Sequence, residues 1–145
     1  MNPLPLVLVT FFGGLAATLQ PSINARLAQK IGLIESAFVS FLVGTAVLLV
    51  IALSTPGGDL RAIPTARWWE LTGGFLGALF VATTILAVPR IGTTATMAII
   101  ITAQLSMGML LDHFGLFGLR HIPLDLRRLA GVALLALGVA LILRR

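Results

Sequence analysis

The sequence contains no cysteine and few charged residues. Without thiols, disulfide bonds, thiolate nucleophiles and cysteine-based metal sites are excluded. Only 10% of the 145 residues are charged, whereas a soluble domain of this size carries about 25%. These charges are too few to cover a water-facing surface. The composition therefore argues against a soluble enzyme, a disordered segment and a nucleic-acid-binding module.

Groups that would support catalysis or cofactor binding are also missing. The sequence has no nucleotide-binding P-loop and no visible pairing of a nucleophile with a base. The histidines, His113 and His121, are too isolated to suggest a metal site. We therefore expect no enzymatic activity, no cofactor and no bound metal.

Long apolar runs dominate the chain, which is 58% hydrophobic and has a mean hydropathy of +1.06. A helix needs about 20 apolar residues to cross a hydrocarbon core of about 30 Å. The fifth run is short, but flanking arginines can extend it because their side chains snorkel outward. Charged residues divide the sequence into uncharged runs at 1–25, 36–58, 71–89, 91–111 and 129–143. We predict an all-α integral membrane protein, a single domain over residues 1–145, with spans of about 3–25, 36–55, 69–89, 91–111 and 127–143.

Basic residues are divided equally between the two sides of the predicted membrane. Five spans place loops two and four on the N-terminal side, and loops one and three on the other side with the C-terminus. Lys and Arg asymmetry normally sets orientation, and here it is nil. We interpret this balance as dual topology, in which copies insert both ways; the alternative is that the first helix or a partner resolves a weak bias. The N-terminal side carries Arg61, Arg67, Arg120, Arg127 and Arg128, and the other side carries Arg26, Lys30, Arg90, Arg144 and Arg145.

The small size of the chain favours the same interpretation. Five helices alone could hardly enclose a pathway that opens to both sides of a membrane. Many transporters contain inverted-topology repeats, and an antiparallel homodimer would build such a structure from two copies. We therefore expect each chain to supply half of a ten-helix inverted-repeat transporter, with lipid and an oppositely oriented copy as its partners.

Four segments resemble a known family. They are residues 20–27 (QPSINARL), 40–45 (SFLVGT), 112–118 (DHFGLFG) and 128–132 (RLAGV). Together they resemble the YdcZ-like family of small bacterial inner-membrane proteins, a domain of unknown function in the drug/metabolite transporter superfamily. The resemblance implies a transporter or exporter in the bacterial inner membrane, without implying a substrate.

The four-helix relatives of that family, the small multidrug-resistance proteins, use an embedded glutamate in helix one. This sequence has no acidic residue between Met1 and Ile34, so the role of that carboxylate cannot be carried over. Binding of a permanent cation therefore has weak electrostatic support. We prefer a neutral or amphipathic solute.

The first predicted helix carries the best candidate for a substrate-lining face. Gly13, Ala17, Gln20 and Asn24 share one side of a helix that turns 100° per residue. Small residues permit close approach, and the amides supply donors and acceptors. Pro21 removes a backbone donor, which predicts a gating kink. The alternative is an ordinary packing face with both amides near the membrane interface.

Two further polar side chains extend the candidate lining. Gln104 is the most central polar residue of the fourth span, where it either contacts a ligand or joins two helices. Ser40 belongs to a small-residue stripe with Ser36 and Gly44, a pattern more typical of helix packing.

Carboxylates at the ends of spans are candidates for proton coupling. Glu35 precedes the second span and Asp112 ends the fourth. A structural role at the interface is the alternative for both, since a carboxylate at a helix N-terminus is favoured by the helix dipole.

The fifth span is rich in small residues and nearly free of polar ones. Close backbone approach at small residues commonly drives helix pairing in lipid. We therefore assign Gly131, Ala133, Ala136 and Gly138 to the dimer interface.

The function predicted from these features is the export of a small organic molecule or metabolite by alternating access, carried out by the antiparallel dual-topology homodimer. A dual-topology channel and a non-transporting membrane scaffold are the alternatives.

Overall fold

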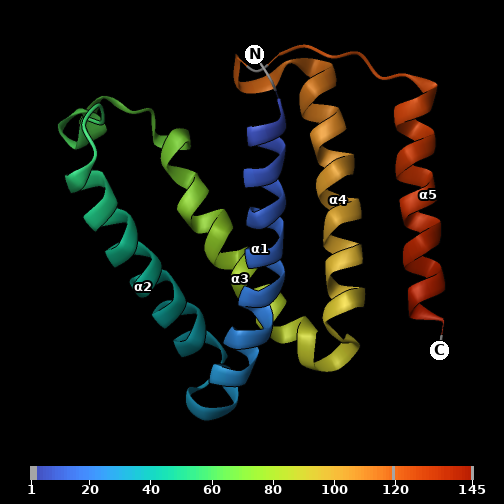
Figure 1. Ribbon diagram of the computed structural model, residues 1–145, viewed down its shortest axis with the longest axis horizontal. Helices are drawn as coiled ribbons and strands as arrows, with labels where there is room; N and C mark the ends of the chain where they lie inside the picture. The colour runs from blue at the N-terminus through green and yellow to red at the C-terminus, as the bar shows by residue number, and fades with distance from the viewer. Residues whose placement is uncertain (1–2, 119, 145) are drawn as a thin grey trace. The chain divides into compact units, whose positions relative to one another are not determined.

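The computed structural model describes residues 3–118 and 120–144, and within them the chain is helical with no β-strand. This confirms the predicted all-α class. The chain divides into two compact units, unit 1 over Met1–Arg90 and unit 2 over Ile91–Arg145. Unit 1 contains α1 (Leu4–Ile31), α2 (Leu33–Ser54), the 3-10 helices η1 (Leu60–Thr65) and η2 (Trp68–Thr72), and most of α3 (Gly73–Ile91) (Figure 1). Unit 2 contains α4 (Thr93–Phe114), the 3-10 helix η3 (Leu116–Gly118) and α5 (Leu126–Leu143).

In the described part of the chain, five helices are long and apolar enough to cross a membrane. Their bounds differ from the uncharged runs because a helix can continue past its apolar segment. The first helix runs through Arg26 and Lys30 to Ile31, and the next begins at Leu33. The connection between α1 and α2 is therefore a single residue.

That residue, Gly32, forms a turn that requires glycine. Its backbone has φ 103° and ψ 160°, a conformation that side chains other than glycine rarely adopt. The N–H of Gly32 donates to the Ala28 carbonyl (2.9 Å), and the Gly32 carbonyl accepts from the N–H of Ser36 (3.1 Å). A Cβ at this position would also overlap the Glu35 carboxylate. Gly92 precedes α4 with a similar backbone conformation, φ 83° and ψ 158°.

The three helices of unit 1 pack together over a small core. The buried side chains of Ala37 from α2 and of Val81 and Ile85 from α3 form this core, against which Ala28 of α1 also packs. Large apolar side chains elsewhere on these helices are exposed, for example Leu6 at 72%. Such exposure would be costly in water and is ordinary in lipid.

Unit 2 is a helical hairpin in which α4 packs against α5 (Figure 1). Gly115 ends α4 in the left-handed conformation, and Asp125 caps α5 by accepting the N–H of Arg128 (2.7 Å). Glycines on both helices leave hollows along their contact, including cavities of about 300 Å³ and 440 Å³ that both reach Gly131.

Candidate functional site

Four polar residues of α1 and α2 come together in unit 1, and we call them the amide cluster: Gln20, Asn24, Ser36 and Ser40. The Nδ2 of Asn24 donates to Ser40 Oγ (3.1 Å), and the Nε2 of Gln20 donates to the same oxygen (3.4 Å). The hydroxyl of Ser36 donates to the backbone carbonyl of Asn24 (2.8 Å). Three of the predicted lining residues therefore share hydrogen bonds across the two helices.

The residues of the amide cluster differ in their solvent exposure. Ser36 is 0% exposed and Asn24 is 6% exposed, whereas Gln20 lies on the exposed surface. Pro21, which lies between the two amides in the sequence, is fully buried, and α1 continues as a helix through it. Because proline has no N–H, the carbonyl of Ala17 lacks its usual helical partner at this level. The gating kink at Pro21 stays a prediction.

The amide oxygens of the cluster remain available. Within the part of the chain that the structure describes, neither Gln20 Oε1 nor Asn24 Oδ1 accepts a hydrogen bond, and no buried side-chain oxygen is left without a partner. Asn24 is 6% exposed, so only a small part of its side chain can be reached by another molecule. A carbonyl oxygen accepts hydrogen bonds, so the cluster can receive N–H or O–H groups from another molecule.

The small residues predicted beside the amides continue the same face of α1. Gly13 and Ala17 are both exposed, and a Cβ at Gly13 would meet nothing within 4 Å. Gln104 is also exposed, but it lies on α4 in unit 2. Its membership of the same lining therefore stays a prediction.

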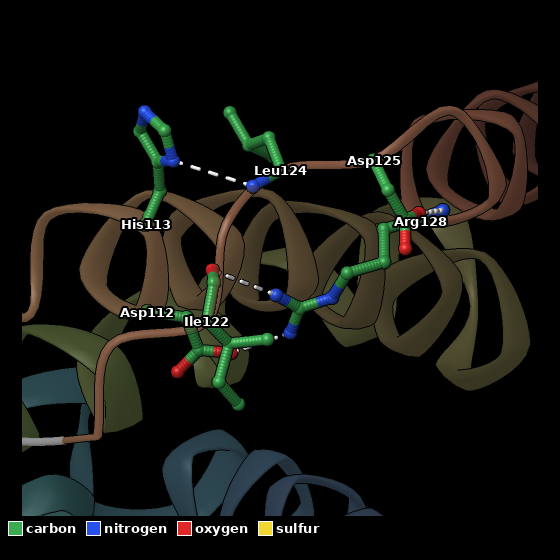
Figure 2. Close-up of polar contacts among 6 residues, drawn as sticks. All are labelled: Asp112, His113, Ile122, Leu124, Asp125 and Arg128. Carbon is green, nitrogen blue, oxygen red and sulfur yellow. Dashed lines mark hydrogen bonds and ion pairs between the residues drawn. The ribbon is translucent and has the colours of Figure 1, made fainter.

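A second polar arrangement ties the ends of α4 and α5 together (Figure 2). The guanidinium of Arg128 forms an ion pair with the carboxylate of Asp112, and each side chain is 30% exposed. Arg128 also donates to the carbonyl of Ile122 (3.4 Å), whose N–H donates to the carbonyl of Asp112 (2.9 Å). His113 Nδ1 accepts the N–H of Leu124 (3.3 Å). This pairing was not predicted from the sequence, although a charge at each end of one interhelical connection was a usable signal.

Both members of this ion pair occupy helix ends that disfavour their own charge. Asp112 lies in the last turn of α4 and Arg128 in the first turn of α5, whereas helix dipoles favour the opposite signs there. Their mutual attraction offsets this cost. The arrangement supports a structural role for Asp112 beside the predicted role in proton coupling, which stays a prediction, as does that of the exposed Glu35.

Exchanging the two charges distinguishes these roles. We expect Asp112→Ala alone to lower the free energy of unfolding by about 1 kcal/mol. The double variant Asp112→Arg/Arg128→Asp should be at least as stable as wild type, because each charge then matches its helix end. Thermal unfolding and transport are measured on the same preparations. A stable exchanged variant that transports normally would eliminate proton coupling through Asp112, and a stable variant without transport would support it.

The small residues of α5 lie on two faces. Gly131 and Gly138 line cavities against α4, whereas Ala133 and Ala136 are exposed and line neither cavity. At 100° per residue the two alanines lie roughly 140–200° from Gly131. The four residues therefore lie on two faces of α5, and their assignment to a dimer interface stays a prediction.

The described residues contain no cluster of metal ligands. Across residues 3–118 and 120–144, no group of three or more His, Asp or Glu side chains could hold a metal ion.

Apolar helices of membrane-spanning length, with polar groups gathered at helix contacts, define a multi-pass helical membrane protein. The family described as "Putative inner membrane exporter, YdcZ" matches residues 5–141, and the chain belongs to this family. It is 30% identical over 137 residues to the "Inner membrane protein YdcZ" of Escherichia coli (strain K12), which covers 91% of this chain and 90% of that protein. No solved structure matches the chain.

These matches confirm the resemblance and the inner-membrane location predicted from the sequence. The description of the family also supports a role in membrane export, which points away from an enzyme.

Proposed function

We propose that the chain exports a small organic solute by alternating access, as an antiparallel homodimer in which the amide cluster lines the solute pathway. The observation that carries this proposal is the convergence of Gln20 and Asn24 on Ser40, which leaves both amide oxygens without a partner in the described residues. Unpaired polar groups are expensive in a membrane and are characteristic of substrate pathways.

The chemistry of the amide cluster suits a neutral or amphipathic solute with N–H or O–H groups. Gln20, Asn24 and Ser40 carry no charge, and the free oxygens of the two amides accept hydrogen bonds. The exposed Gly13 and Ala17 extend this face as a shallow apolar strip against which the rest of the solute can lie. The cluster thus selects by hydrogen bonding and shape rather than by charge.

The position of the cluster along α1 suits an antiparallel pair. Residues 20–24 lie in the second half of a helix that runs from Leu4 to Ile31. In two oppositely oriented copies, one cluster would lie nearer each face of the membrane, which is the geometry of inverted repeats that open alternately. Pro21 leaves α1 one backbone hydrogen bond short at this level, so a modest bend there costs little.

Solute flux through liposomes tests this function. Purified protein is first screened against a panel of metabolites for thermal stabilisation, because a ligand that binds the folded state raises its stability by mass action. The stabilising solute is then loaded into proteoliposomes and its efflux is measured against concentration. An exporter gives a rate that saturates. A rate that rises linearly to high concentration would indicate a channel, and the absence of flux for every stabilising solute would indicate a scaffold.

A further inference from the structure

A separate cavity of about 260 Å³ lies in unit 1, close to the turn at Gly32. Helices α1, α2 and α3 all contribute to it. Most of its wall is apolar, and the polar groups that line it are the side chains of Gln29 and Arg90. The lining used in this argument comprises Ala28, Gln29, Leu33, Ile85, Pro89 and Arg90.

The polar groups that line this cavity can still donate hydrogen bonds. Gln29 Oε1 accepts from the guanidinium of Arg26 (2.7 Å), which leaves the amide NH₂ of Gln29 free to donate. Arg90 donates from one nitrogen to the carbonyl of Leu86 (3.1 Å), and its other N–H groups remain available. Arg26 thereby adds a second positive charge beside the cavity through its contact with Gln29.

These cations have no internal counter-ion. In the described part of the chain, neither Arg26 nor Arg90 lies within ion-pair distance of a carboxylate. Glu35, the acidic residue nearest to Arg26 in the sequence, folds back over Gly32 and forms no ion pair there either. The cavity therefore combines the guanidinium of Arg90, the amide donor of Gln29 and an apolar wall, with the guanidinium of Arg26 beside it through Gln29.

The geometry points to a binding site for a phosphate-bearing anion, held by Arg90 and Gln29 and supported by Arg26. Arginine matches phosphate oxygens with paired, charge-assisted hydrogen bonds, and basic pockets between membrane helices bind anionic lipid headgroups. The apolar wall of Ala28, Leu33 and Ile85 suits the first carbons of an acyl chain. The anion is either a lipid headgroup or free phosphate, and the site does not depend on the proposed export function.

Titration of purified protein in detergent tests this site, with the thermal midpoint as the readout. Phosphatidylglycerol should raise the midpoint more than phosphatidylcholine, whose choline group offsets the phosphate charge. Arg90→Gln should require about tenfold more phosphatidylglycerol for the same shift, and Arg90→Lys should keep most of the response. Gln29→Leu should weaken the response several-fold although it leaves the net charge unchanged. If inorganic phosphate blocks the response, the site takes the free anion; if it does not, the lipid is the ligand.

Arg61→Gln is the matched control. It removes the same charge from the exposed η1 segment, away from the lining of this cavity. It should leave the response to phosphatidylglycerol within twofold of wild type. Equal stabilisation by phosphatidylcholine, or a loss in Arg61→Gln as large as that in Arg90→Gln, would overturn the site. A wild-type response in Gln29→Leu would do so as well.

Discussion

Replacing Asn24 with alanine should reduce solute efflux from proteoliposomes by about tenfold or more and remove the stabilisation of the protein by its solute. Asn24 is the buried member of the amide cluster and supplies one of its free acceptor oxygens. Loss of even one hydrogen bond to a desolvated group costs about 1–3 kcal/mol, and each 1.4 kcal/mol is a factor of ten in affinity. Gln20→Ala should have a smaller effect, since Gln20 is exposed and its bond to Ser40 is longer.

The serines of α2 supply a matched control for this experiment. Ser40→Ala removes the hydroxyl on which both amides converge, whereas Ser54→Ala removes one that only returns to its own helix at Val50 (2.7 Å). The substitution and the helix are the same in both variants. Efflux should fall in Ser40→Ala and persist in Ser54→Ala. If Asn24→Ala, Gln20→Ala and Ser40→Ala all retain wild-type efflux while folding normally, the amide cluster does not line the pathway.

Two added lysines should be enough to force the protein into one orientation and to abolish its activity. The five-to-five balance of Lys and Arg leaves no net preference, so a small change should decide the insertion. If the active unit needs one copy of each orientation, a variant locked in either direction is inactive alone. Co-expression of two oppositely biased variants should restore export, because each supplies the orientation that the other lacks.

The structure determines where these lysines can be placed. The connection between α2 and α3 has room, and Gly58→Lys with Ala62→Lys adds two exposed charges there; a Cβ at Gly58 would meet nothing within 4 Å. Only Gly92 separates α3 from α4, so this connection has no room for added residues. The variant with the opposite charge bias therefore carries its lysines on the exposed helix ends, as Ile91→Lys with Thr94→Lys. A reporter fused to the C-terminus should be detected on both sides of the membrane in the wild-type protein. A single location, with each variant active alone, would exclude the antiparallel homodimer.

Periodicity and composition together predicted the polar face of α1. Gln20 and Asn24 share one side of any α-helix, whatever its neighbours, because their positions relative to each other follow from the 3.6-residue repeat. Nothing in the sequence could say which part of the second helix they meet. The single-glycine turn at Gly32 sets that register, and so brings Ser36 and Ser40 opposite Asn24.

The small residues of α5 show that a shared composition does not place residues on one face of a helix. Gly131 and Gly138 share a face because seven residues complete nearly two turns, but Ala133 and Ala136 lie on the other side. Packing against α4 then places the glycines along the hollows of unit 2. The distinction between the face toward α4 and the opposite face depends on which helix is the neighbour, which the sequence does not state.

The sequence by itself determined the class of the protein. Runs of about 20 apolar residues with few charges are stable only as helices in lipid, since no water is available there for the backbone. The tertiary structure alone decided which residues far apart in the chain meet. It pairs Asn24 with Ser40 and Arg128 with Asp112, and it places Gln29 and Arg90 in the lining of one cavity. Hydropathy is a property of each segment, whereas a hydrogen bond or an ion pair depends on the turns that bring two segments together.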